Sequence, residues 1–193
     1  MDPMHTAGYT YGTAAVARSP VTMKDLADLQ ECVGWTPRDE AALRKAATFL
    51  PQHLDAMLGQ WQGVFGRIFV SGFVGKDGQP IDRYLQAAHG RLVMWLKDTL
   101  ERPMDQAWLD YQNEIALRHH RSKKNRTDGV ESTDVVPLRF IVAMVHPMSD
   151  IRKFLALGGH TPEEVDAMHA AWGKSLTIQV ALWSRPYARD GDW

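Results

Sequence analysis

Two adjacent histidines, His119 and His120, lie near the end of a helix-like run that starts at Trp108. At about 100° per residue, one narrow face of this helix carries Trp108, Tyr111, Ile115 and His119. His120 is turned well away from that face. The pattern therefore predicts that His119 points inward and His120 outward. Because a neutral imidazole is the commonest metal ligand in proteins, His119 is a candidate for the single protein ligand of an iron cofactor.

An inward histidine at the end of a helix has two interpretations. Periodicity alone favours a packed core histidine whose ring nitrogens find partners inside the protein. The alternative is an iron ligand, and its second ring nitrogen then needs an acceptor, such as a backbone carbonyl of the preceding turn. The helix pattern leaves both interpretations open.

The remaining histidines do not support a metal site with several protein ligands. Zinc needs three or four His, Cys, Asp or Glu ligands at suitable spacing, and no His-Glu-x-x-His motif occurs. The other six histidines are scattered along the sequence: His5, His53, His89, His146, His160 and His169. We therefore expect no zinc site and no iron site of the multi-ligand type.

A short basic cluster overlaps the histidine pair and consists of Arg118, Arg121, Lys123, Lys124 and Arg126. Three interpretations fit it: a solvated helix end whose cations complement the helix dipole, a phosphate-binding surface, and a partner for ligand carboxylates. The cluster lacks interleaved aromatic residues and the chain has a net charge of -1. We therefore expect no nucleic-acid partner.

Composition fits a single globular domain spanning residues 1–193. The one cysteine, Cys32, excludes an internal disulfide and suits a reducing compartment, so we expect a cytoplasmic protein. The N-terminus lacks the features of a signal peptide, and no apolar run approaches the roughly 20 residues that span a bilayer. Seven tryptophans and nine methionines supply apolar surface that suits a core or the wall of a large flat ligand.

Helical signals cover most of the chain and predict an all-α fold of six to eight helices. Threonine caps at Thr22, Thr36 and Thr161 mark three of the helix starts, two of them followed directly by proline. The expected helices cover residues 23–32, 40–66 with a break at Pro51, 81–100, 104–120, 136–157 with a kink at Pro147, and 161–183. Residues 64–74 are interpreted as a helix end and a turn, and residues 125–137 as a loop.

Six sequence motifs together resemble the protoglobins, which are single-domain haem proteins of archaea and some bacteria. In chain order they are Gly8-Tyr-Thr-Tyr-Gly12, Trp108-Leu-Asp-Tyr-Gln112, Glu114, Arg118-His-His-Arg121 with Lys123-Lys124-Asn125, Gly159-His-Thr-Pro-Glu-Glu164, and Gln179-Val-Ala-Leu-Trp-Ser184 with Pro186-Tyr187. The resemblance implies a globin fold with an extra N-terminal helix. It also implies an N-terminal extension, residues 1–20, that helps to bury haem b.

The resemblance assigns roles around the haem. His119 would be the proximal ligand, with Tyr111 and Ile115 on the same side. The distal wall would begin with Trp61 and Gln62, where the family has tryptophan and tyrosine, so an amide replaces a phenol as hydrogen-bond donor to a bound gas. Three further distal positions are Ala88, Leu92 and Met144. Phenylalanine is common in the family at the last two, so we expect a roomier pocket.

The expected function is binding of oxygen, carbon monoxide or nitric oxide at the iron, opposite His119, for gas transport, sensing or scavenging. The alternatives are a haem enzyme that activates peroxide or oxygen, or transfers carbenes or nitrenes, and a helical interaction module without a cofactor. No residue is a compelling general acid or base beside the iron, so no catalytic residue is assigned. The resemblance also implies a homodimer formed through the last two long helices, residues 136–157 and 161–183.

Overall fold

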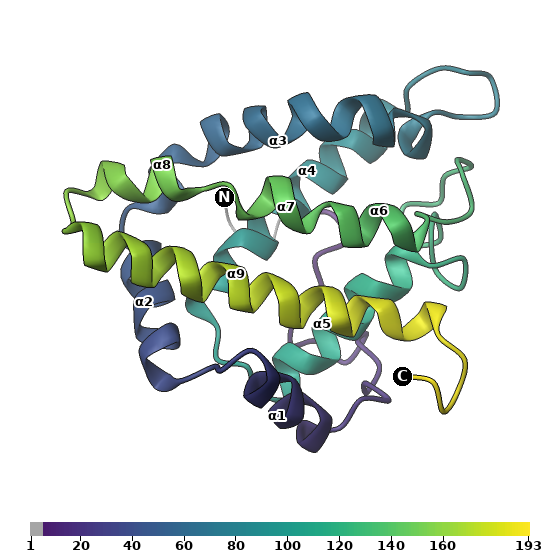
Figure 1. The fold of residues 1–193 in the computed structure, drawn as a ribbon. Helices are drawn as coiled ribbons and strands as arrows, with labels where there is room; N and C mark the ends of the chain where they lie inside the picture. The colour runs from purple at the N-terminus through teal and green to yellow at the C-terminus, as the bar shows by residue number, and fades with distance from the viewer. Residues whose placement is uncertain (1–5) are drawn as a thin grey trace.

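Helices make up the fold seen in the computed structural model, which describes residues 6–193 except for the side chains of residues 65 and 67–71. The prediction of an all-α fold is confirmed: within that range the one β feature is an isolated bridge between Val74 and Pro80. In chain order the helices are α1 (Met23–Cys32), α2 (Pro37–Ala47), α3 (Leu54–Phe69), α4 (Asp82–Glu101), α5 (Gln106–His119), α6 (Leu138–Ala143), α7 (Val145–Ser149), α8 (Arg152–Leu155) and α9 (Pro162–Ser184) (Figure 1). None of the helices in the described range has both the length and the apolar character needed to cross a bilayer.

Side-chain caps begin the helices where the sequence predicts them. The Thr22 hydroxyl accepts from the amide of Asp25, 3.2 Å away, and the Thr161 hydroxyl accepts from the amide of Glu164 at 3.3 Å. The Glu164 carboxylate in turn accepts from the amide of Thr161, which completes a capping box. These bonds satisfy amide groups that have no partner inside the first helical turn.

The stretch from residue 136 to residue 157 is broken into α6, α7 and α8, so the expected single kinked helix is wrong. Pro147 has no N–H to donate to the carbonyl of Ala143, and α6 ends at Ala143. A second break follows at Asp150. Helix α9 bonds the carbonyls left there, since Trp172 Nε1 donates to Met148 at 2.8 Å and His169 Nε2 contacts the Ser149 carbonyl at 2.9 Å.

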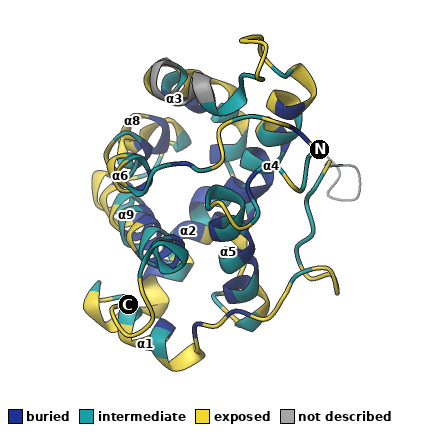
Figure 2. Cartoon of the chain, turned by 90° about the vertical axis from the view of Figure 1, so that its right-hand side faces the viewer, coloured by how far each residue is buried: buried dark blue, intermediate teal, exposed yellow. Residues whose placement is uncertain are grey.

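Helix α9 is the central element of the packing. Helices α6, α7 and α8 run in a row along one side of it, in the opposite direction, and α2 and α5 pack against it as well (Figure 1). Buried positions gather where these helices face one another, while the outer faces of α1 and α9 are exposed (Figure 2). At the centre, the Trp95 ring lies 5.8 Å from Trp172 and 6.2 Å from Trp183, and its indole N–H donates to Gln179.

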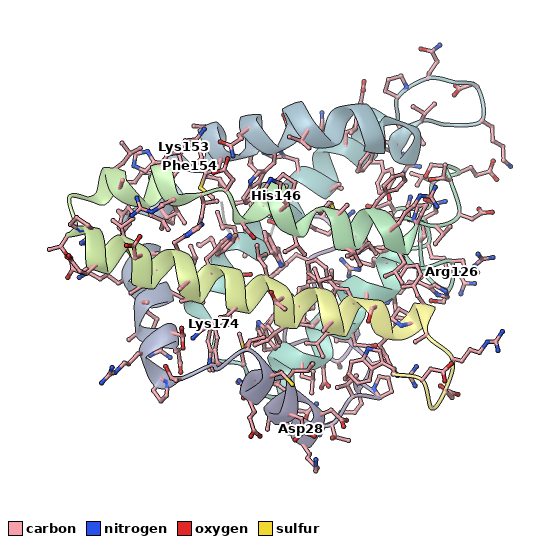
Figure 3. All side chains as sticks on the ribbon, viewed as in Figure 1. Asp28, Arg126, His146, Lys153, Phe154 and Lys174 are labelled. Carbon is pink, nitrogen blue, oxygen red and sulfur yellow. The ribbon has the colours of Figure 1, made fainter. Side chains whose placement is uncertain are left out.

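An ion pair fixes α9 against α2. Lys174 on α9 lies 2.9 Å from the Asp39 carboxylate and also donates to the Gly34 carbonyl at 2.7 Å (Figure 3). Burial alone would raise the pKa of Asp39, but hydrogen bonds from Lys174 and Thr36 outweigh it and lower that pKa. The pair therefore holds the middle of α9 against α2.

The cap of α9 gives a direct test of this packing. Replacing Thr161 by alanine removes the acceptor for the Glu164 amide, so the free energy of unfolding should fall by about 1 kcal/mol in urea titrations. Thr161→Ser keeps the hydroxyl and should remain close to the unmodified protein. Equal losses for both substitutions would show that the hydroxyl does not cap the helix.

Candidate functional site

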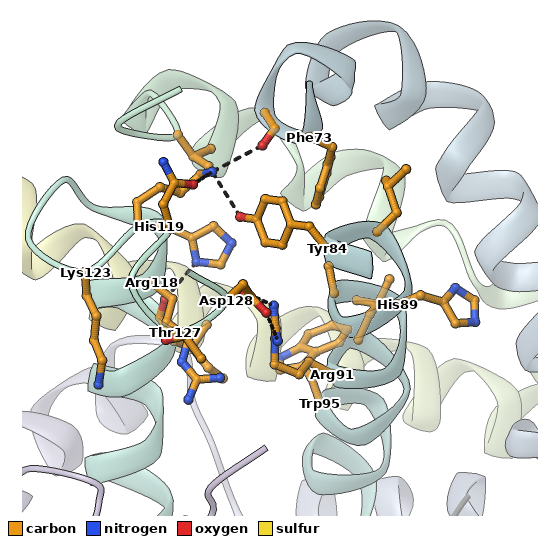
Figure 4. Close-up of a pocket in the computed structure, with 18 of the residues that line it drawn as sticks. Phe73, Tyr84, His89, Arg91, Trp95, Arg118, His119, Lys123, Thr127 and Asp128 are labelled. Atoms are coloured by element: carbon orange, nitrogen blue, oxygen red, sulfur yellow. Dashed lines mark hydrogen bonds and ion pairs between the residues drawn. The ribbon is translucent and has the colours of Figure 1, made fainter. Parts of the chain in front are cut away.

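A cavity of about 590 Å³ lies between α4 and α5, and side chains from α3, α7 and α9 complete its wall (Figure 4). Its volume falls in the range of small-molecule binding sites. Apolar side chains such as Leu92, Ile115 and Met144 line its interior, and charged groups gather at one rim. The cavity can therefore take a large apolar molecule with polar groups at one end.

His119, the last residue of α5, lies on the cavity wall with its ring pointing into the open space (Figure 4). Its Nδ1 lies 2.8 Å from the carbonyl oxygen of Ile115. Because a carbonyl only accepts, Nδ1 carries the proton and Nε2 keeps its lone pair. No described residue hydrogen-bonds Nε2. Burial lowers the pKa of His119, so the ring is neutral and presents a free basic nitrogen to the cavity.

The ring of Trp183 supports this histidine from α9. The two rings are nearly parallel, at 21°, with their centres 6.0 Å apart. The Trp183 indole is itself held by a 2.9 Å bond to the side chain of Gln112. Both the rotation and the tilt of the imidazole are thus fixed before any ligand arrives.

Two other histidines near His119 do not point into the cavity. His120 is outside the cavity, where its ring packs on Tyr187 and Nδ1 contacts Ser122, so the predicted inward–outward division of the pair is confirmed. His89 borders the cavity on α4 but is exposed, and Figure 4 shows its ring pointing away from His119. Within residues 6–193, no three His, Cys, Asp or Glu side chains gather into a metal site.

Three of the cations at the cavity rim are paired with carboxylates. Arg91 makes two 2.9 Å bonds to Asp128. Arg118 and Lys123 both contact the buried Glu114, at 2.8 Å and 2.7 Å. Each of these cations therefore has a carboxylate partner, and Arg118 and Lys123 share theirs.

Lys124 differs from these neighbours. It is only 7% exposed and borders the cavity, yet its Nζ meets four neutral oxygens: Gly72 O, Tyr84 Oη, Asn125 Oδ1 and Ser132 Oγ, at 3.0–3.2 Å. No carboxylate of the described residues lies within ion-pair distance of it. Burial lowers the pKa of Lys124 to about 8. A buried cation without a counter-charge favours an anionic group in the neighbouring space.

The N-terminal segment 6–13 crosses the same rim. Arg91 donates to the Ala7 carbonyl at 3.0 Å, and Arg118 donates to the Gly8 carbonyl at 2.6 Å and to the Thr10 hydroxyl at 3.2 Å. The two arginines that border the cavity therefore also hold this segment in place.

Comparison with protein families matches the chain over residues 22–193 with the family described as Protoglobin. The chain belongs to the protoglobin family. The family is one of globin-type haem proteins that bind gases, so a haem cofactor and gas ligands are implied. No curated protein sequence matches the chain.

The cavity of this protoglobin fits a haem. His119 offers a lone pair on Nε2, which is the donor that an iron centre needs from one side. The walls are apolar, as the porphyrin requires, and Lys124 places an unpaired positive charge at the rim, where carboxylates of the cofactor would lie.

Seven of the eight residues that the sequence analysis assigned to the site line the cavity: Gln62, Ala88, Leu92, Tyr111, Ile115, His119 and Met144. Gln62 is exposed and therefore stands at the mouth. Trp61 is fully buried but does not border the cavity; its ring lies 6.3 Å from Trp95, which does. Its indole N–H has no acceptor among the described residues.

The sequence analysis missed the pairing at the rim. Glu114 and Arg118 stand four residues apart on α5, a spacing that could have indicated their contact. Arg91 and Asp128 are separated by 37 residues, and no local signal joins them. The unusual position of Lys124 depends on Gly72 and Tyr84, which lie 52 and 40 residues away in the sequence, so it follows only from the fold.

Gly8 gives a test of how the N-terminal segment sits on the rim. Its φ is +73°, and a Cβ there would lie 2.8 Å from a guanidinium nitrogen of Arg91. Gly8→Ala should therefore lower the free energy of unfolding by about 2 kcal/mol and expose the segment to proteolysis.

Gly12→Ala is the matched control, because Gly12 has φ +70° but no atom near its Cβ position. It should show the smaller loss due to backbone strain alone. Equal effects of the two substitutions would contradict the contact between Gly8 and Arg91.

Proposed function

We propose that this protoglobin binds haem b through Nε2 of His119 and takes a diatomic gas on the opposite face of the iron. The observation that carries the proposal is the Nδ1 bond to Ile115, because it directs the free lone pair of His119 into an apolar cavity. When bound, haem supplies an iron that accepts His119 on one face and oxygen, carbon monoxide or nitric oxide on the other.

The chain's own residues favour non-covalent haem. Covalent attachment uses cysteine thiols, as in a Cys-x-x-Cys-His motif, and the one cysteine of this chain is exposed on α1. His119, Lys124 and apolar packing are then the means of retention, which supports haem b.

On the gas side, the wall offers few hydrogen-bond donors. Gln62 at the mouth carries an amide that can donate to a bound gas, and Trp61 behind the wall has an indole N–H without an acceptor. Leu92 and Met144 contribute no polar atoms that donate. Hydrogen bonding to a bound gas therefore depends on Gln62. The side chains of Ala88, Leu92 and Met144 are small or flexible and leave space around the gas.

A second candidate function is haem-dependent catalysis, either oxidation with peroxide or oxygen, or carbene or nitrene transfer. It is favoured by the exposed Gln62 at the mouth and by small or flexible side chains at Ala88, Leu92 and Met144, which leave room for an organic molecule. Turnover with peroxide or a diazo compound, measured against simple gas binding, separates the two functions.

We also propose a homodimer formed through α6–α8 and α9. Val142 on α6 is 52% exposed, and Leu157 just after α8 is exposed as well, so apolar surface is present on that side. The assembly would pair the same face of two copies. Sedimentation velocity distinguishes a dimer from a monomer of 21.8 kDa.

The histidine pair tests the axial ligand. His119→Ala should lose haem or bind it loosely, because the iron has no protein donor on that side, whereas His120→Ala should keep it. The measurement is the Soret band per protein after reconstitution and desalting. Equal retention by the two variants would overturn the assignment, and the absence of a Soret band in the unmodified protein would overturn haem binding altogether.

Lys124 tests the placement of the haem carboxylates. Lys124→Gln should weaken haem retention by roughly tenfold, the usual size of a lost hydrogen bond to a charged group. Haem dimethyl ester, whose carboxylates are blocked, should bind the unmodified protein and the variant alike. Lys123→Gln is the control, since Lys123 is already paired with Glu114. A loss with the ester as large as that with haem would contradict the role of Lys124.

A further inference from the structure

Three tyrosine rings connect the cavity with the N-terminal segment. Tyr111 belongs to the cavity wall, and its ring centre lies 5.5 Å from Tyr9 and 5.3 Å from Tyr11, both in edge-on contact. Tyr9 and Tyr11 stack on each other at 6.5 Å. Tyr111 is buried, whereas the other two are partly exposed. The rings form a continuous aromatic path from the cavity toward solvent.

At the outer end of this path, the hydroxyl of Tyr9 contacts a proton acceptor. This hydroxyl donates to the Asp98 carboxylate, with distances of 2.9 Å and 3.0 Å to the two oxygens. Asp98 is only 4% exposed and also accepts from Arg102 at 3.3 Å. Burial raises the pKa of this carboxyl, and the hydrogen bonds from Tyr9 and Arg102 only partly offset that rise. A carboxylate with a raised pKa in direct contact is a good base for a phenol that loses an electron, because the phenol becomes strongly acidic at that moment.

The other oxidisable rings at the cavity lack such a base. The indole N–H groups of Trp95 and Trp183 donate to the side-chain amides of Gln179 and Gln112, which do not take up protons at neutral pH. The hydroxyl of Tyr84 is contacted by the ammonium group of Lys124, which offers a proton and does not accept one. Among these rings, the geometry favours Tyr9 as the residue that holds the radical after one-electron oxidation.

We propose that Tyr111 and Tyr9 relay an electron to the haem when hydrogen peroxide reacts there, and that Asp98 takes the proton of Tyr9. The relay rests on the proposed haem site. The relay adds a one-electron oxidation of Tyr9, outside the cavity. A soluble reductant can reach Tyr9 by way of Tyr11, which stacks on it and is partly exposed.

The step balances. Hydrogen peroxide takes two electrons as its O–O bond breaks. Bound haem would supply one of them, and Tyr111 would supply the other and regain it from Tyr9. One oxygen atom leaves as water with both peroxide hydrogens, and the other stays at the haem. Tyr9 becomes a neutral tyrosyl radical, and its proton moves to an oxygen of Asp98. Hydrogen peroxide is the only oxidant required.

The test is electron paramagnetic resonance of the haem-reconstituted protein, frozen at set times after mixing with hydrogen peroxide. The unmodified protein should show a neutral tyrosyl radical, and Tyr9→Phe, which keeps the ring packing, should lose it. Asp98→Asn keeps the shape but removes the base, so radical formation should slow by about 100-fold, the lower end of what a positioned proton acceptor contributes. Tyr187→Phe is the control, since Tyr187 does not border the cavity and its hydroxyl donates to the backbone carbonyl of Val136, and it should leave the radical unchanged.

The Soret band of each sample separates the two proposals. A sample without that band overturns the haem site, and the relay with it. A full Soret band with a tyrosyl radical that survives Tyr9→Phe, or that forms equally fast in Asp98→Asn, overturns the relay alone. A radical lost in Tyr187→Phe would place the radical on Tyr187 and would likewise overturn the relay.

Discussion

The 2.8 Å contact between His119 Nδ1 and the carbonyl of Ile115 is the interaction on which the site depends. It uses a carbonyl one helical turn before the ring, and a carbonyl oxygen has two lone pairs, so it can accept from a side chain as well as from the helix. This one bond fixes the tautomer of the histidine. The stacking of Trp183 from α9 then fixes the plane of the ring. Nε2 of His119 is therefore already oriented toward the cavity before a ligand binds.

Charge at the rim follows a second constraint. Arg91 is paired with Asp128, while Arg118 and Lys123 share Glu114. The two arginines also hold the N-terminal segment. Lys124 alone, among the charged residues described at the rim, meets only neutral oxygens. The rim therefore carries an excess of positive charge at one end of an apolar space, and Lys124 is the rim cation that has no carboxylate partner among the described residues. This asymmetry gives the cavity a polar end and an apolar end, which orients an amphipathic cofactor.

Local chemistry explains why part of this could be predicted from the sequence. The inward face of α5 and the caps at Thr22 and Thr161 depend on neighbours within one helical turn, and the structure has them where the pattern indicates. The break of α6 from α7 and α8 depends on Pro147 together with partners supplied by α9. Likewise, the place of Trp61 behind Trp95 depends on tertiary packing. Such features require contacts between distant segments, and no single stretch of sequence encodes them.

The most direct test of the central claim is a crystal structure of the protein reconstituted with haem. The account predicts iron bonded to Nε2 of His119, while Nδ1 still donates to the carbonyl of Ile115 and the porphyrin lies in the cavity between α4 and α5. Iron bound to another side chain, or a porphyrin outside this cavity, would contradict it.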